Sequence, residues 1–240
     1  MPRLAILLTT FNRPHLLAQS LPQIEREANR LRVPLVISDD HSTNIDTAVL
    51  LEGARSRGVD VIQPAQPRGD IEDPHHCIQK NNLFAFDYVL QAFPDLELIL
   101  KVDDDVVMID GAFSHMLATW DRAKTQGLDV LTLSGIRTIN EPILQMFDGY
   151  AKTSGSCNAA VIYQAADWKI YSQEVAQWII LAEGFDCAFL GRYANQYRPL
   201  AMTLSLVPSV VYHTGLTGVH TRGADYNVDY AGSLGGVVTK

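Results

Sequence analysis

Three consecutive carboxylates, Asp103, Asp104 and Asp105, carry the strongest chemical signal in the sequence. They lie within residues 98–110, between two apolar runs in which Val and Ile predominate, and this pattern favours a buried strand over a helix. Acidic side chains are rarely buried unless they are paired or bind something, and Mg²⁺ or Mn²⁺ prefers oxygen ligands. Three adjacent negative charges also repel one another unless a cation neutralises them. The triplet therefore predicts a divalent-cation site, and an acidic turn exposed to solvent is the alternative.

Two further polar segments follow apolar runs that are typical of buried parallel strands. Residues 9–13 follow the run 4–8, and residues 39–43 follow the run 34–38. In open α/β sheets, ligands bind at the carboxyl ends of the strands. Since the acidic triplet also follows a strand, we expect these three segments to form one site.

The remaining pattern in the first half alternates helices with strands. Apolar residues at helical spacing predict helices over 16–31, 46–57, 77–93 and 112–124, and β-prone runs predict strands over 60–63 and 129–134. Pro22 is expected to start or kink part of the first helix. This alternation predicts an α/β fold with a mostly parallel central sheet and helices on both faces. We expect one domain over residues 1–240.

The second half is less regular. Strands are expected over 143–147, 157–163, 201–206 and 209–212, with a flexible segment at 152–156. Helical stretches are expected over 165–171 and 174–180, and Asp186 can cap a further helix that runs to Asn195. The last strand delivers His213, and residues 214–240 have the low periodicity of a mobile flap.

Composition indicates a compact globular protein. Hydrophobic residues make up 47% and charged residues 19% of the chain, which is unlike a disordered protein. The net charge of −8 gives no overall electrostatic footprint for nucleic acid, although a local basic patch remains compatible with it. Three cysteines without a C-x-x-C motif indicate reduced thiols, and no apolar run reaches the length of a signal peptide or membrane span. We therefore expect a soluble, cytoplasmic protein.

Four motifs, in order, resemble those of family-2 glycosyltransferases. Residues 7–14 (Leu-Leu-Thr-Thr-Phe-Asn-Arg-Pro) resemble the first-strand motif, and residues 36–43 (Val-Ile-Ser-Asp-Asp-His-Ser-Thr) resemble the second-strand motif. Residues 78–82 (Ile-Gln-Lys-Asn-Asn) stand where the family has an Ala-Arg-Asn helix start, and residues 102–105 match its D-x-D motif. The similarity covers residues 4–110 well and the rest loosely.

The resemblance implies the A-type glycosyltransferase fold, a Rossmann-like sheet in which residues 1–110 bind the nucleotide sugar and residues 111–240 the acceptor. The implied reaction is transfer of a sugar from a nucleoside-diphosphate sugar, most commonly a UDP-sugar, to an acceptor hydroxyl with inversion. By the same resemblance, Asp105 holds Mn²⁺ or Mg²⁺, and a late histidine, His213, completes the coordination shell. Asp103 would face the ribose and sugar, and Asp104 would be the free middle position.

The resemblance also implies which residues bind the donor and which remove the acceptor proton. The expected donor-binding residues are Thr9, Phe11, Asn12, Arg13, Asp39, Asp40, Lys80, Asp103 and Asp104. Apart from the resemblance, Arg68 is a further donor-binding candidate because Gly69 allows a close approach of the backbone, and an arginine exposed on a loop is the alternative. The family's general base is the central Asp of a later motif, but here the stretch reads Glu183-Gly-Phe-Asp186, with glycine at that position. Either Asp186 or Glu183 must take the role, and Asp186 is alternatively only a helix cap. Lys80 and His41 replace the family's usual Arg and Gly.

Two other functions stay open at this point. A nucleotidyltransferase that makes sugar nucleotides would usually carry a glycine-rich loop after the first strand, and residues 9–14 contain no glycine. A non-catalytic sugar-nucleotide binder is favoured only if neither Glu183 nor Asp186 faces the site. The acceptor is a glycan, a lipid-linked sugar, a protein or a modified DNA base, and the acidic net charge disfavours DNA.

Overall fold

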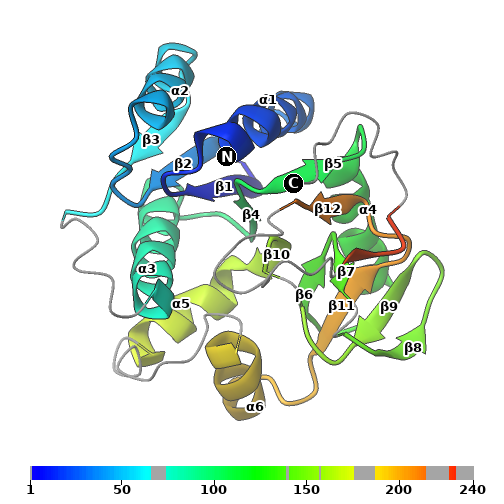
Figure 1. Ribbon diagram of the computed structural model, residues 1–240. Helices are drawn as coiled ribbons and strands as arrows, with labels where there is room; N and C mark the ends of the chain where they lie inside the picture. The colour runs from blue at the N-terminus through cyan, green and yellow to red at the C-terminus, as the bar shows by residue number, and fades with distance from the viewer. Residues whose placement is uncertain are drawn as a thin grey trace.

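The computed structural model describes residues 2–65, 74–138, 141–156, 158–175, 187–214 and 227–230 of the 240-residue chain. A single nine-stranded sheet forms its centre, and helices pack on both faces of this sheet (Figure 1). The predicted fold class, an α/β fold with a mostly parallel sheet, is confirmed.

The strands of the central sheet lie in the order β3-β2-β1-β4-β10-β6-β11-β9-β8. All of them except β10 and β9 run in the same direction. Their bounds are β1 (Leu4–Thr10), β2 (Leu35–Asp39), β3 (Asp60–Ile62), β4 (Leu98–Asp103), β6 (Val130–Ser134), β8 (Ile143–Met146), β9 (Tyr150–Thr153), β10 (Ala160–Gln164) and β11 (Met202–Leu206). Two small sheets pair β5 (Val106–Met108) with β12 (Val211–His213), and β7 (Arg137–Thr138) with β13 (Asn227–Val228).

The helices divide between the two faces of the sheet. One face carries α1 (Pro14–Leu31), α2 (Ile45–Ser56) and α4 (Ala112–Thr125). The other carries α3 (Pro74–Ala92), α5 (Ala165–Val175), the π-helix η1 (Cys187–Tyr193) and α6 (Ala194–Tyr197). Strand β1 serves both layers, because Leu4, Ile6 and Leu8 pack toward the first face and Ala5 and Leu7 toward the second. An all-apolar run is what such a doubly covered strand requires.

Three details differ from the sequence-based expectation. The first helix begins at Pro14, whose missing N–H suits the first turn, and Pro22 lies inside it. The segment expected to be flexible contains the end of strand β9, which pairs with β11, and the hydroxyl of Thr153 lies 3.2 Å from that of Ser205. That pairing is with a strand about fifty residues away, so local sequence did not reveal it. The run around the acidic triplet divides into β4 and β5.

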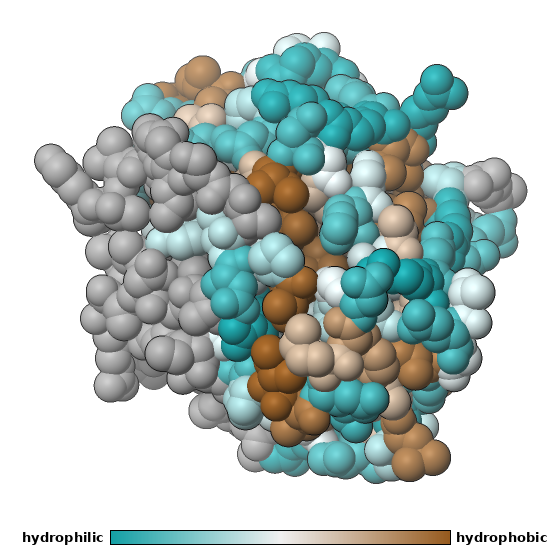
Figure 2. All heavy atoms as spheres, turned by 90° about the vertical axis from the view of Figure 1, so that its right-hand side faces the viewer, coloured by the Kyte–Doolittle hydropathy of each residue, from teal (hydrophilic) through white to brown (hydrophobic). Residues whose placement is uncertain are grey.

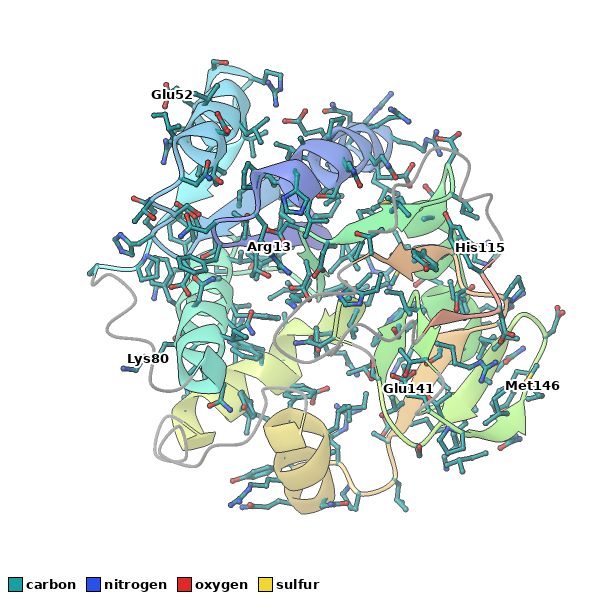
Figure 3. All side chains as sticks on the ribbon, viewed as in Figure 1. Arg13, Glu52, Lys80, His115, Glu141 and Met146 are labelled. Carbon is teal, nitrogen blue, oxygen red and sulfur yellow. The ribbon has the colours of Figure 1, made fainter. Side chains whose placement is uncertain are left out.

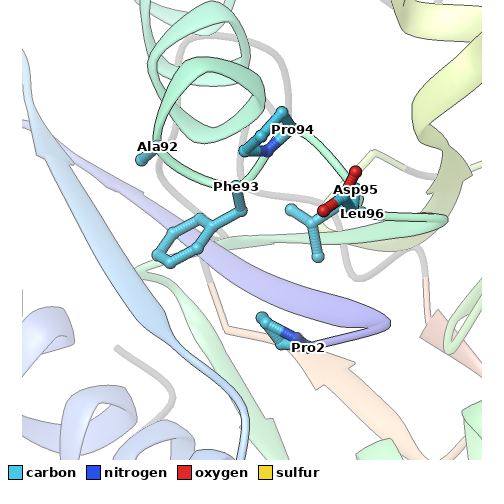
Figure 4. Close-up of a pocket in the computed structure, with 6 residues that line it drawn as sticks. All are labelled: Pro2, Ala92, Phe93, Pro94, Asp95 and Leu96. Carbon is cyan, nitrogen blue, oxygen red and sulfur yellow. The ribbon is translucent and has the colours of Figure 1, made fainter.

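A shallow pocket of about 240 Å³ lies at the end of α3, lined by Pro2, Phe93 and Leu96 among others (Figure 4). It adjoins the starts of β1 and β4, the sheet edge opposite to the one predicted to bind ligands. Figure 2 shows the right-hand side of Figure 1, where apolar and polar residues are mixed. No helix in the part of the chain that the structure describes is both long and apolar enough to cross a membrane.

Candidate functional site

The three polar segments meet at the carboxyl edge of β1, β2 and β4. In the strand register, Thr9 lies beside Asp103 and Thr10 lies beside Asp39. The structure thus brings together residues that the sequence placed on three separate strands, as parallel pairing requires.

Asp103 ends β4 and is held by two donors. The Thr9 hydroxyl donates a hydrogen bond to Asp103 Oδ1 over 2.8 Å, and Lys101 Nζ forms an ion pair with the same oxygen. Lys101 is only 2% exposed and also donates to the main-chain carbonyl of Asn158 over 2.9 Å. Both donors bind Oδ1 of this carboxylate.

Asp104 is fully buried rather than free. The Thr10 hydroxyl donates to Asp104 Oδ2 over 2.7 Å, and Arg13 Nη2 contacts Oδ1. Burial raises the pKa of Asp104 to about 7, and the charge of Asp105 adds to this effect, while Arg13 opposes it. The expectation of a free middle carboxylate was wrong, because the chain turns after β4 and directs this side chain inward.

Asp105 contacts residues from two distant segments of the chain, Arg13 and the pair His213 and Thr214. Its Oδ2 lies 2.6 Å from Arg13 Nη1 and 3.1 Å from His213 Nε2. Its main-chain carbonyl accepts hydrogen bonds from the N–H and hydroxyl of Thr214, over 2.7 and 2.9 Å. Burial opposes ionisation, but the hydrogen bond from His213 and the charge of Arg13 outweigh it and hold the pKa of Asp105 below its usual range.

His213 reaches Asp105 through the small sheet. Strand β12 pairs antiparallel with β5, which places His213 opposite Val106, the residue after Asp105. Burial lowers the pKa of His213, but the hydrogen bond to Asp105 outweighs this and raises it. The two residues predicted as metal ligands are therefore neighbours in space.

Arg13 brings a positive charge to the acidic triplet through its contacts with Asp104 and Asp105. Figure 3 labels Arg13 near the start of α1. It precedes α1, and its side chain turns back over Asp104 and Asp105. Burial lowers its pKa, but the attraction of Asp105, Asp104 and Asp103 outweighs burial and raises it. We expected a bound cation to relieve the repulsion of three carboxylates; in the structure, the side chains of Arg13 and Lys101 neutralise much of it.

The neighbouring loops form a braced rim beside the triplet. Asn12 has a positive φ of 51°, and its side-chain oxygen accepts hydrogen bonds from the N–H groups of Thr43 and Asn44 over 2.7 and 2.9 Å. Asp39 is 1% exposed and accepts hydrogen bonds from Ser42 and from Gln63 Nε2. Asp40, 6% exposed, follows it at the end of β2.

The other predicted site residues are not all brought to this cluster. Phe11 is half-buried and lies between Thr10 and Asn12 in the chain. Lys80 is exposed on α3 and points outward, away from Arg13 (Figure 3). Arg68, Glu183 and Asp186 lie outside the described residues.

Sequence reasoning missed Lys101 and Asn81. Lys101 is a charged residue within an apolar strand, two residues before Asp103. Because residues i and i+2 of a strand share a face, the sequence pattern could have predicted the ion pair between Lys101 and Asp103. Asn81 is buried and its side-chain oxygen accepts a hydrogen bond from Ser38 over 2.7 Å, which joins α3 to β2. Asn81 lies within the sequence motif at residues 78–82, which was the available signal for it.

The ligand types around Asp105 fit a divalent cation. Asp105 Oδ1 is buried and has no hydrogen-bond partner among the described residues. The same residues include no ready-made cluster of three or more His, Cys, Asp or Glu side chains. Mg²⁺ commonly binds one or two carboxylates together with substrate phosphates, and Asp105 is a carboxylate of that kind. The imidazole of His213 beside it is a ligand type that suits Mn²⁺.

The fold is that of the A-type glycosyltransferases, on the evidence of solved structures. S. aureus TarS matches with a TM-score of 0.58 and 17% identity over 85% of this chain and 35% of that chain. Its 1–349 fragment in complex with UDP-GlcNAc gives a TM-score of 0.58 and 17% identity over 93% of this chain and 61% of that one. The mannosyltransferase PcManGT from Pyrobaculum calidifontis, in complex with GDP-Man and Mn²⁺, gives 0.51 and 12% identity over 84% of this chain and 54% of that one.

The chain thus spans between about a third and three fifths of the length of these structures. No protein-family profile matches the sequence, and no curated protein matches it.

Proposed function

We propose that this protein is a glycosyltransferase that moves a sugar from a nucleoside-diphosphate sugar to an acceptor hydroxyl. The observation that carries the proposal is the joining of Asp105 and His213, beside Asp103, at the carboxyl edge of a sheet with the A-type fold. The complexes of structural neighbours with UDP-GlcNAc and with GDP-Man and Mn²⁺ support it.

In this proposal, different residues of the site bind the metal ion and the sugar nucleotide. Asp105 and His213 would hold Mn²⁺ or Mg²⁺, which when bound neutralises the charge that develops on the diphosphate leaving group. Asp103 Oδ2 would accept a hydrogen bond from the ribose or sugar. Lys101 and Thr9 keep that carboxylate in place.

The nucleotide would lie along the braced rim. Thr9 and Phe11 would bind the nucleotide together with Asn12, Asp39 and Asp40 of the rim. Arg68 is proposed as a further donor contact, whereas Lys80, which is exposed on α3 and directed away from Arg13, is not placed at the rim. Inversion requires a base that accepts the proton of the acceptor hydroxyl, and Asp186 or Glu183 would serve. We propose UDP as the donor's nucleotide; a glycan, a lipid-linked sugar, a protein and a modified DNA base remain candidate acceptors.

Sugar-nucleotide screening tests this function. A ligand that binds only the folded protein raises its melting temperature, so UDP-, GDP-, CDP- and dTDP-sugars are each added with and without Mn²⁺. We expect a shift that depends on Mn²⁺ and slow release of the nucleoside diphosphate from the same donor. Asp105→Ala should remove both effects, whereas Asp148→Ala, at a side chain that is 97% exposed, should keep them. A screen in which no sugar nucleotide shifts the wild-type protein would contradict the proposal.

A further inference from the structure

Arg13 stands between two buried carboxylates and the solvent. Its Nη1 lies 2.6 Å from Asp105 Oδ2, and its Nη2 contacts Asp104 Oδ1. The side chains of Asp104 and Asp105 are 0% and 5% exposed, whereas that of Arg13 is 34% exposed. The guanidinium therefore covers the acidic pair on its outer side.

The two carboxylate partners of Arg13 are anchored, whereas the side chain of Arg13 itself is 34% exposed. Thr10 anchors Asp104, and Thr214 anchors the main chain of Asp105. Lys101, a second basic side chain at the triplet, is 2% exposed and is held between Asp103 and a main-chain carbonyl. His213, the third, is 20% exposed and lies 3.1 Å from Asp105 Oδ2. Of the basic side chains around the triplet, that of Arg13 is the most exposed.

A divalent cation at Asp105 conflicts with this arrangement. Arg13 and His213 share Oδ2, and the remaining oxygen, Oδ1, belongs to the same carboxylate. Because Mg²⁺ binds oxygen at about 2.0–2.1 Å, the ion would lie within a few ångströms of the guanidinium, and the two positive charges would repel each other.

We propose that Arg13 is a displaceable counter-cation that keeps divalent cations weakly bound until a nucleoside diphosphate draws its guanidinium away. This inference rests on the proposed function and adds an order to its binding steps. Guanidinium binds phosphate oxygens through two parallel hydrogen bonds, so a diphosphate offers Arg13 partners equivalent to the two carboxylates. The cation and the nucleotide then favour each other's binding, and this coupling is reciprocal.

The test measures binding and needs no turnover. Mn²⁺ is titrated into the wild-type protein, Arg13→Gln and Arg13→Lys, and free Mn²⁺ is followed by electron paramagnetic resonance. We expect Arg13→Gln to bind Mn²⁺ alone about tenfold more tightly than wild type, and Arg13→Lys, which keeps the charge, to remain close to wild type. Arg13→Met replaces Arg13→Gln if the latter does not fold, as judged by thermal unfolding in EDTA.

Arg3→Gln is the matched control. Arg3 also binds two carboxylates, Glu97 and Asp121, each at 2.7 Å, but at the opposite edge of the sheet. Its substitution should leave Mn²⁺ affinity unchanged, which excludes unspecific binding to freed carboxylates.

The second measurement is the affinity for UDP and GDP with and without Mn²⁺. We expect Mn²⁺ to raise the affinity of wild type for one of them by about tenfold, and to raise that of Arg13→Gln by much less. An Arg13→Gln protein that binds Mn²⁺ alone no more tightly than wild type overturns the inference while leaving the proposed function intact. Absence of Mn²⁺ binding from every variant, with nucleotide present, overturns both.

Discussion

His213 Nε2 lies 3.1 Å from Asp105 Oδ2, because β12 pairs with the short strand that begins directly after Asp105. Thr214, the next residue, strengthens this link by donating two hydrogen bonds to the carbonyl of Asp105. A late segment of the chain is therefore attached to the acidic turn at both its side chain and its main chain. The first prediction follows from this pair.

His213→Ala should weaken Mn²⁺ binding in the presence of nucleotide by about tenfold to a hundredfold, because one nitrogen ligand is lost while Asp105 remains. Isothermal titration with Mn²⁺ at saturating UDP measures this. His115→Ala is the control, since His115 is exposed on α4. Equal affinity for Mn²⁺ in wild type and His213→Ala would show that His213 only supports the shape of the site.

Asp104→Asn should change stability in a pH-dependent way in protein freed of metal by EDTA. The pKa of Asp104 in the folded protein is about 7, above its ordinary value of 3.8. The folded state therefore holds the proton more strongly than the unfolded state, and the stability that this gives at low pH is lost as pH rises toward and through about 7. Asparagine cannot ionise and avoids that loss.

The melting temperature of Asp104→Asn minus that of wild type should therefore increase between about pH 5 and pH 8. Both proteins keep Asp105 and His213, so the effects of these two groups largely cancel in the difference. Thermal unfolding at a series of pH values measures it. A difference that stays constant or shrinks over this range would mean that Asp104 ionises like an exposed carboxyl group.

Lys101→Met should destabilise the protein by about 3 kcal/mol, the low end for breaking a buried ion pair, because Asp103 is partly exposed. The substitution leaves Asp103 with the Thr9 hydroxyl and deprives the Asn158 carbonyl of its donor. Urea unfolding measures the loss. Lys124→Met, at an exposed lysine in α4, should stay within about 0.5 kcal/mol of wild type. A similarly small effect for Lys101→Met would show that the ammonium contributes little to holding Asp103.

The fourth prediction concerns the general base. Asp186→Asn should lower kcat by about 10²–10⁴-fold while donor affinity is kept, because the amide cannot accept the proton of the acceptor hydroxyl. Glu183→Gln is measured in parallel for both turnover and donor affinity. If only the Glu183 variant loses turnover, the two roles are exchanged; if neither does, the base lies elsewhere.

The sequence alone determined the layered fold and the position of the site. Continuous apolar runs such as residues 4–8 predict strands covered on both faces, and parallel strands bring their carboxyl ends to one edge. For that reason the amino-acid pattern by itself places Thr9, Asp39 and Asp103 together. These signals are local: each depends on a run of a few residues and the polar residues that end it.

Only the tertiary structure determined the burial, the partners and the pKa of each charged group. Asp104 and Asp105 are neighbours in sequence, yet burial raises the pKa of the first, while His213 and Arg13 lower that of the second. The difference arises because successive side chains leave the turn in different directions and meet partners from distant segments. Strand β9 and the pairing of β12 with β5 also depend on contacts between distant residues, which local patterns of apolar and polar residues do not encode.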